Sequence, residues 1–399
     1  MTGPLTGPVT GPLTGIVVAD LTRALAGPHA AMLLGDLGAR VIKVEHPVTG
    51  DESRHWGPPF AGPAGDQVST YFLSCNRNKE SVTCDLKTAA GRTFLSRLVR
   101  HCDVLLENFR PGVLDAAGFG CARLHELNPR LVICSISGFG HDGPEAERPG
   151  YDQIVQGEAG LMSVTGQDRD HPVKAGLSIA DVLAGLNAAV GAVAALVERE
   201  RTGRGRVVRT SLLAAMVGAH AFQGTRWTVA RQVPHMTGNH HPSIAPYGAF
   251  RCADGLIQLG IANEQQWQRF AAVAGIESGD ERFAVNHARV AHRDELTAEI
   301  EQRLARAGGH HWLAQFAQAG VPVGAIRTID EVYEWEQTRS QGLVITVEHP
   351  ILGSIELPGP ALRFDEPEPG AHAPPPLLGQ HDPRVQAWLD EMDAADPTT

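Results

Sequence analysis

Short apolar runs alternate with helical patterns along the chain from Ile16 onward. The apolar runs have the length and composition of buried strands, and they cover residues 16–20, 40–45, 103–109 and 131–139. The helical patterns between them cover residues 29–38, 88–101 and a short segment from residue 124. This alternation predicts an α/β fold with a doubly wound (Rossmann-like) parallel sheet. Because ligands of such sheets bind beyond the carboxyl ends of the strands, we expect function in the loops 22–28, 45–54 and 107–112.

The length and the change of pattern along the chain predict two domains. A chain of 399 residues is too long for one ordinary core. Residues 1–15 repeat Gly and Pro every four residues and predict a flexible tail. We expect the large domain to begin with residues 16–221, a smaller α+β domain to span 222–330, and residues 331–399 to return to the large domain.

Composition excludes several classes of protein. The apolar fraction of 43% and charged fraction of 20% are those of a globular protein. A net charge of −11 argues against non-specific nucleic-acid binding, which needs a basic face. The longest apolar stretch, 182–197, is interrupted by Gly185, Asn187 and Gly191, and the N-terminus lacks the basic and apolar regions of a signal peptide. We therefore expect a cytoplasmic protein that neither spans a membrane nor binds nucleic acid.

Ligand motifs with strong signatures are absent from the sequence. No GxGxxG follows the first strand and no GxxxxGK[ST] occurs, which disfavours a dinucleotide or a P-loop nucleotide. The six cysteines form no CxxC pair, so we expect free thiols. The spacing of His235, His240 and His241 matches no strong metal-ligand pattern, and we predict no metal site.

Asp181 begins a long helical pattern rich in Ala and Gly, residues 181–200. An aspartate in this position is most often an N-cap that accepts backbone N–H groups. The functional alternative is a carboxylate nucleophile that backbone donors and the helix dipole hold and tune. The residue and its neighbours alone leave both interpretations open.

Two further features indicate an anionic ligand. Asn108 and Arg110 directly follow an apolar strand, where Asn can bond polar groups and Arg can pair with phosphate, although Pro and Gly also make this a plausible structural turn. A segment near the first loops is basic within an acidic chain, which favours a polyanion over a solvated surface. Its basic residues are Lys43, His46, Arg54, Arg77, Lys79 and Lys87.

Taken together and in order, the motifs resemble the class III CoA-transferase family, which includes formyl-CoA transferase, carnitine CoA-transferase and 2-methylacyl-CoA racemase. The resemblance extends over nearly everything after Leu13. The matching stretches include ADLTRALAGP (19–28), LLGDLGARVIKVEHPVTGD (33–51), DVLLENFRPGVLDAAGFG (103–120), NPRLVICSISGFGHDGP (128–144), RPGYDQIVQGEAGLMSVTG (148–166) and PLLGQHDPRVQAWL (376–389).

The resemblance implies a role for each matching residue. Asp181 matches the catalytic aspartate, and Tyr151 matches a position beside that aspartate. The positions that match the CoA site are Ala24, Leu25, Ala26, His46, Cys84, Lys87, Asn108 and Phe109. The family fold further implies an interlocked homodimer, no permanently bound cofactor, and acyl-CoA and a carboxylic acid as substrates.

This chain departs from formyl-CoA transferase at two positions and in one loop, where TGNHHPSIAP (237–246) replaces a glycine-rich capping loop. Leu25 stands where that enzyme has Gln, and Ala116 where it has Arg, so a phosphate contact is either lost or supplied by Arg110. Formate and oxalate are therefore weakly supported as substrates. Small dicarboxylates, aromatic acids, carnitine-like acids and bile acids all remain open.

Three functions are compatible with the resemblance. In a transferase, Asp181 would attack a thioester and form first an aspartyl anhydride and then an aspartyl-CoA thioester. In a 2-methylacyl-CoA racemase, two opposed acid/base groups would exchange the α-proton. The racemase has His at the position of Tyr151, and tyrosine, with an ordinary pKa of about 10, is a poor base. The third function is a non-catalytic acyl-CoA-binding protein. We expect the transferase.

Overall fold

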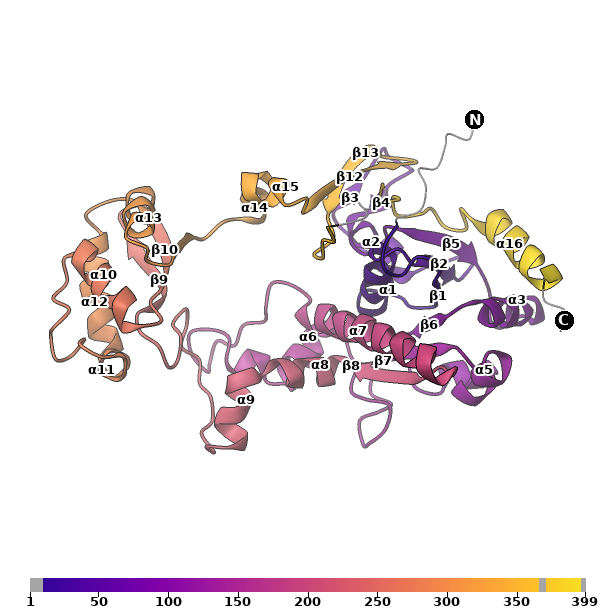
Figure 1. Ribbon diagram of the computed structural model, residues 1–399, viewed down its shortest axis with the longest axis horizontal. Helices are drawn as coiled ribbons and strands as arrows, with labels where there is room; N and C mark the ends of the chain where they lie inside the picture. The colour runs from indigo at the N-terminus through magenta and orange to yellow at the C-terminus, as the bar shows by residue number, and fades with distance from the viewer. Residues whose placement is uncertain (1–9, 366–370, 396–399) are drawn as a thin grey trace. The chain divides into compact units, whose positions relative to one another are not determined.

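The computed structural model of the protein describes residues 10–365 and 371–395 (Figure 1). Its contacts group the chain into two compact units. The first holds the described residues up to Leu161, then Ala175–Ala230, and those from Glu336 onward. The second holds Met162–Lys174 and Arg231–Trp335. The second unit thus begins nearer residue 231 than the expected 222, and it also includes an excursion from the large unit.

Six parallel strands form the sheet of the first unit. In spatial order they are β5 (Lys79–Thr83), β2 (Arg40–Glu45), β1 (Val17–Asp20), β6 (Val104–Glu107), β7 (Val132–Ser137) and β8 (Val207–Ser211). The chain runs outward from β1 to β2 and β5, then returns to the other side of β1 through β6. This reversal opens a crevice between β1 and β6, the usual ligand position in doubly wound sheets. The predicted α/β fold with a parallel sheet is confirmed.

Helices cover both faces of this sheet (Figure 1). The helices that contribute to one core cluster are α1 (Ala26–Asp36), α6 (Asp152–Glu158), α7 (Ile179–Thr202) and α8 (Leu212–Ala219). Those that contribute to the core cluster of the other face are α3 (Ala89–His101), α5 (Cys121–Leu127) and α16 (Asp382–Ala395). Since α16 packs beside α3, the end of the chain returns to the large unit.

Small residues let α7 approach its neighbours closely. A Cβ at Gly185 would lie 2.5 Å from the carbonyl oxygen of Ala26 in α1, and one at Gly191 would lie 2.5 Å from Val208 in β8. The Ala and Gly content of α7 therefore serves packing. Among the described residues this is the one helix long and apolar enough to cross a membrane, and a helix of a protein core passes the same test of length and composition. Its buried alanines lie in the core cluster beside α1.

Shorter elements complete the first unit. They are η1 (Glu52–His55), β3 (Phe60–Ala61), β4 (Val68–Ser69), α2 (Thr70–Ser74), α4 (Val113–Ala116), α9 (Ala221–Thr228), α15 (Glu336–Ser340), β12 (Val344–His349) and β13 (Gly353–Pro358). Residues 10–15 belong to the segment expected to be a flexible tail, of which residues 1–9 lie outside the described residues. In residues 10–15 the expectation is wrong: Leu13 is buried, and its N–H donates to the Leu37 carbonyl over 2.8 Å.

The second unit has an α+β core of its own. Its antiparallel sheet has the order β11 (Val323–Ala325), β10 (Gly255–Gly260), β9 (Tyr247–Cys252), and Ala253 and Asp254 form the turn between β9 and β10. Its helices are α10 (Glu264–Ala274), α11 (Asn286–Ala291), α12 (Arg293–Leu304), α13 (Gly309–Gln318) and α14 (Ile329–Glu334). Trp267, Phe270 and Phe316 fill the core between the sheet and these helices.

Candidate functional site

Asp181 lies in the first turn of α7 and is not the N-cap of that helix. The N-cap is Ser178, whose side chain caps no backbone N–H. Instead, the carboxylate of Asp152 in α6 accepts a hydrogen bond from the Ala180 N–H over 2.8 Å. A neighbouring helix thus caps α7, and the half-buried carboxyl of Asp181 is not used for capping.

The surroundings of Asp181 change its acidity. Burial, together with the nearby charge of Asp152, raises the pKa of Asp181 to about 7. Tyr71 of α2 lies close enough to respond: burial and the charge of Asp181 raise its pKa to about 12, and its hydroxyl bonds to Ser178. Desolvation makes a carboxylate a stronger nucleophile, and a pKa near neutrality leaves a large ionised fraction for reaction.

The start of α1 faces the same part of α7. Asp181 is one helical turn before Gly185, which touches the carbonyl of Ala26 at the start of α1. Ala24 has a φ of 68°, a left-handed conformation that turns the chain into the helix. Within the described residues, no group accepts a hydrogen bond from the N–H of Leu25, Ala26 or Gly27. Leu25 and Ala26, two of the predicted residues, and Gly27 therefore present backbone donors near the predicted nucleophile.

A cavity of about 530 Å³ lies at the carboxyl ends of β1, β2, β5 and β6. Four residues predicted for the CoA site line it together: His46, Cys84, Lys87 and Phe109. Lys87 is exposed at its rim, whereas Cys84 is buried and burial raises the pKa of its thiol to about 11. An apolar cavity with a basic rim suits a ligand with an aromatic body and anionic groups.

The Asn108 side chain, predicted for the CoA site, binds the backbone of Arg23. Its side-chain oxygen accepts the Arg23 N–H over 2.9 Å, and its amide donates to the Arg23 carbonyl over 2.8 Å. The side chain thereby joins the loops that follow β1 and β6, across the crevice of the sheet. Tyr151 is 62% exposed and occupies the N-cap position of α6, directly before Asp152.

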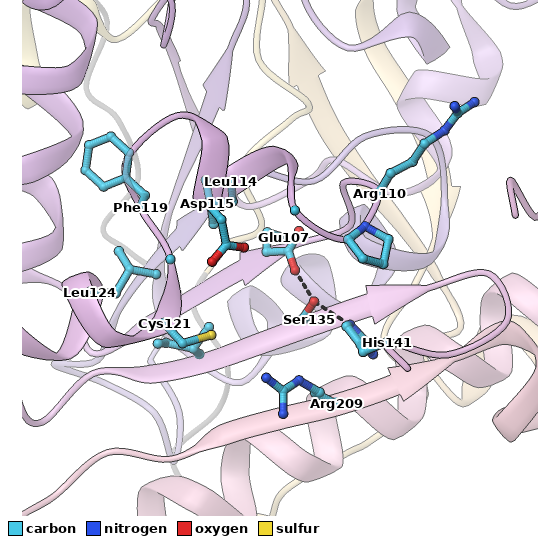
Figure 2. A pocket seen from close by; sticks show the side chains of 14 residues that line it. Glu107, Arg110, Leu114, Asp115, Phe119, Cys121, Leu124, Ser135, His141 and Arg209 are labelled. Carbon is cyan, nitrogen blue, oxygen red and sulfur yellow. Dashed lines mark hydrogen bonds between the residues drawn. The ribbon is translucent and has the colours of Figure 1, made fainter. Parts of the chain in front are cut away.

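Figure 2 shows a second, smaller cavity of about 180 Å³ at the carboxyl ends of β6, β7 and β8. Arg110 lies at this cavity, with its guanidinium directed away from the buried Glu107. The hydroxyl of Ser135 donates to the Glu107 carboxylate and lies 2.6 Å from Nε2 of His141. A hydrolase triad needs the acid on the far side of the histidine, so this arrangement is not a serine-hydrolase site.

The predicted basic cluster is wrong for four of its six members. Lys43 and Lys79 are fully buried and paired with aspartates. Arg54 pairs with Glu45, and Arg77 pairs with Asp36. These cations neutralise internal carboxylates and are not available to a polyanion. His46 and Lys87 are the members of the cluster that line the larger cavity.

Comparisons with known proteins bear on this geometry. A family model described as CoA-transferase family III matches residues 13–382. The succinyl-CoA:glutarate CoA-transferase of Homo sapiens is 39% identical over 92% of this chain and 83% of its own length. The succinate–glutarate CoA-transferase of Agrobacterium fabrum is 38% identical over 95% of this chain and 96% of its own. The crystal structure of a CAIB/BAIF family protein from Brucella suis superposes with a TM-score of 0.85, at 39% identity, over 95% of this chain and 100% of that one.

Proposed function

The chain belongs to CoA-transferase family III and is a CoA-transferase, and we propose that Asp181 is the nucleophile with which it moves CoA from an acyl-CoA thioester to a free carboxylic acid. The observation that carries this proposal is the position of the Asp181 carboxyl. It is relieved of capping by Asp152, partly desolvated, and close to the unused backbone donors at the start of α1.

The reaction begins when the Asp181 carboxylate attacks the thioester carbonyl carbon. The C–S bond breaks, and a mixed anhydride and the CoA thiolate result. The thiolate attacks the aspartyl carbonyl, releases the donor as a carboxylate and leaves an aspartyl-CoA thioester. The acceptor carboxylate then attacks that thioester and forms a second anhydride. Attack of the thiolate on the acceptor's carbonyl carbon gives the new acyl-CoA and restores Asp181.

Backbone donors stabilise the oxyanions of these steps. The N–H groups of Leu25, Ala26 and Gly27 are preorganised by the start of α1 and have no partner among the described residues. Such donors act most strongly where water is excluded. The positive end of the α1 dipole favours the same negative charge.

The 530 Å³ cavity is where we place the nucleotide end of CoA. Phe109 offers an apolar wall, and His46 and Lys87 lie where phosphate oxygens would meet the rim. The pantetheine arm would then cross the crevice between β1 and β6, over the Arg23–Asn108 contact, toward residues 24–27. This binding energy, remote from the reacting atoms, positions the thioester.

Small dicarboxylic acids are the acids we propose as substrates. The human and Agrobacterium relatives are both named for succinate and glutarate. By analogy we propose a succinyl-CoA donor and a dicarboxylate of four or five carbons as acceptor. Steady-state rates from succinyl-CoA with glutarate, an aromatic acid and carnitine as acceptors test the assignment, and a preference for a monocarboxylate would contradict it.

A cytoplasmic, interlocked homodimer completes the proposal. Leu186, Val190 and Val197 leave an apolar stripe of α7 exposed on the single chain. We place this stripe in the interface with a second copy of the chain, because an exposed apolar patch marks a surface that a partner covers. Light scattering after size exclusion should give twice the chain mass, and a monomer at assay concentration would refute this part.

Trapping the aspartyl intermediate tests the central proposal. The enzyme is incubated with succinyl-CoA without acceptor and quenched with hydroxylamine, and its peptides are read by mass spectrometry. We expect a hydroxamate at Asp181, and none in Asp181→Ala. Asp66→Asn changes an exposed aspartate and serves as the matched control.

Each other outcome points to a different function. Full turnover by Asp181→Ala would refute the nucleophile. Deuterium uptake at the α-carbon of 2-methylacyl-CoA without any acceptor would indicate a racemase instead. Binding of CoA without labelling or turnover would indicate a binding protein.

A further inference from the structure

The loop from Thr22 to Pro28 is held by polar groups at both of its ends. Asp20 accepts the Thr22 N–H over 3.0 Å, and Lys43 donates to the Thr22 carbonyl over 3.0 Å. The side chain of Asn108 accepts the N–H of Arg23 and donates to the Arg23 carbonyl. Lys79 donates to the Pro28 carbonyl over 2.8 Å. These hydrogen bonds fix the backbone conformation of the loop at its two ends.

Ala24 is the residue of this loop whose backbone needs support. Its φ of 68° places an L-residue with a Cβ in the left-handed region, at a cost of roughly 1–2 kcal/mol. Its N–H donates to Oδ1 of Asp51 over 3.1 Å. This turn directly precedes the three unused N–H groups of residues 25–27. The direction of those donors therefore depends on the conformation of Ala24.

Asp51 joins this turn to a buried charge network. Its Oδ1 also accepts the backbone N–H and the hydroxyl of Ser53, over 2.9 and 2.8 Å. Its Oδ2 forms an ion pair with Nζ of Lys43 over 2.8 Å, and both side chains are fully buried. Burial alone would raise the pKa of Asp51, but the Lys43 charge and these hydrogen bonds lower it to about 2. The carboxylate is therefore ionised throughout the working range of an enzyme.

The network continues away from the loop through a second aspartate. Lys79 pairs with Asp20 over 2.9 Å and donates to the side chain of Asn76 over 2.9 Å. A buried charge that loses its partner is strongly destabilising, so the members fix one another's positions. Asp51 is the member that reaches the loop at Ala24.

We propose that Asp51 is a positioning residue for the transfer reaction: through the N–H of Ala24 it fixes the turn that directs the backbone donors of residues 25–27 toward the reacting carbonyl. This inference rests on the proposed function. It assigns a catalytic consequence to a carboxylate whose side chain is fully buried in an ion pair with Lys43. The Asp51 carboxylate accepts the Ala24 N–H and so holds the turn, while the N–H groups of residues 25–27 have no acceptor among the described residues.

Asp51→Asn tests the proposal because an amide cannot satisfy both sides of this site. If its oxygen accepts the Ala24 N–H, its NH₂ group faces the Lys43 ammonium, and if it turns, it opposes two N–H donors. We expect kcat to fall on the order of 100-fold, as when an oxyanion donor is lost. The KM for succinyl-CoA should stay within about threefold, because the transition state alone loses an interaction.

Asp36→Asn is the matched control. Asp36 forms a similarly buried ion pair with Arg77, but at the other end of α1. We expect its kcat to stay within about threefold of wild type at equal folded fraction. Equal losses of kcat in the two variants, or a change confined to KM in Asp51→Asn, would overturn the proposal.

A second substitution keeps the test informative if Asp51→Asn is unstable. Glycine adopts a positive φ without the Cβ penalty, so Ala24→Gly in the Asp51→Asn background should recover kcat about tenfold. Failure to recover activity in a folded double variant would refute the link through Ala24.

The rate of labelling at Asp181 separates this proposal from the proposed function. No label in the wild-type enzyme would mean that the proposed function fails. Equal labelling rates in wild type and Asp51→Asn would mean that the positioning role fails while the nucleophile stands.

Discussion

Replacing Asp181 by Asn should stabilise the fold, and the gain should depend on pH. The pKa of this carboxyl rises from an ordinary 3.8 to about 7 in the folded protein. Below about pH 3 the carboxyl is mostly protonated whether the chain is folded or not, so its charge costs almost nothing. As pH rises from about 3 to 7 the unfolded chain loses the proton first, and the folded state is progressively destabilised.

The pKa shift sets the size of the effect. Moving the pKa of one carboxyl from 3.8 to about 7 corresponds to about 4 kcal/mol of lost stability above pH 7. Asp181 is only half-buried, so water screens part of the penalty, and we expect about 2 kcal/mol. Asp181→Asn cannot ionise and should recover this amount.

Urea denaturation of both proteins at pH 4 and pH 8, at one protein concentration, measures the difference. The variant should exceed wild type only slightly at pH 4 and by the full amount at pH 8. Asp66→Asn, at an exposed aspartate, controls for a general effect of removing negative charge. A stability difference that is the same at both pH values would refute the reasoning about desolvation.

Three further predictions concern the site. Asp152→Asn keeps an oxygen that can cap α7 but removes a charge that contributes to the raised pKa of Asp181. The rising limb of kcat/KM against pH should therefore move to lower pH. A pH–rate profile measures this, and an unchanged limb would contradict it. Lys87→Ala should raise the KM for succinyl-CoA about threefold with kcat unchanged, and the effect should shrink in 0.5 M salt, about five times the ionic strength at which the Debye length is 10 Å. Gly185→Ala would press a Cβ against the first turn of α1 and should lower kcat and the urea midpoint, whereas Gly218→Ala in α8 meets no atom within 4 Å and should lower neither.

The alternation of apolar runs was sufficient to predict the large sheet because most of its strands are buried on both faces. The segments at 40–45 and 131–139 contain the observed strands β2 and β7. The second reads as a nearly apolar run, whereas the first also buries Lys43 and Glu45 in ion pairs. The edge strand β5 was not predicted. Its sequence, KESVT, is polar, since Lys79 is buried through an ion pair and not through apolar packing. A charge that finds its partner 59 residues away leaves no local pattern.

The same physical reason explains the error in the basic cluster. From the sequence we took Lys43 and Arg54 to be available to a ligand, because the positions of basic residues in a sequence do not show which acidic residues they contact. In the fold, Arg54 lies 2.7 Å from Glu45, and Lys43 lies 2.8 Å from Asp51. Both acidic partners lie in segment 45–54, but the sequence alone does not show which cation each of them contacts. The residues that do line the cavity, His46 and Lys87, follow strand ends and could be predicted from that position.

The groups that surround Asp181 bear on the choice between transfer and α-proton exchange. A racemase needs a second base opposed to the aspartate, and the sequence offered only Tyr151 for comparison. Tyr71, which the sequence did not single out, has a pKa raised to about 12 and therefore stays protonated at neutral pH. The two oxygens of Asp152 are already engaged by the Ala180 N–H and the Gln156 amide. Neither Tyr71 nor Asp152 therefore offers a free base opposite Asp181. The carboxyl of Asp181 is suited to attack a carbonyl carbon, because that reaction needs a nucleophile and an oxyanion site but no second base.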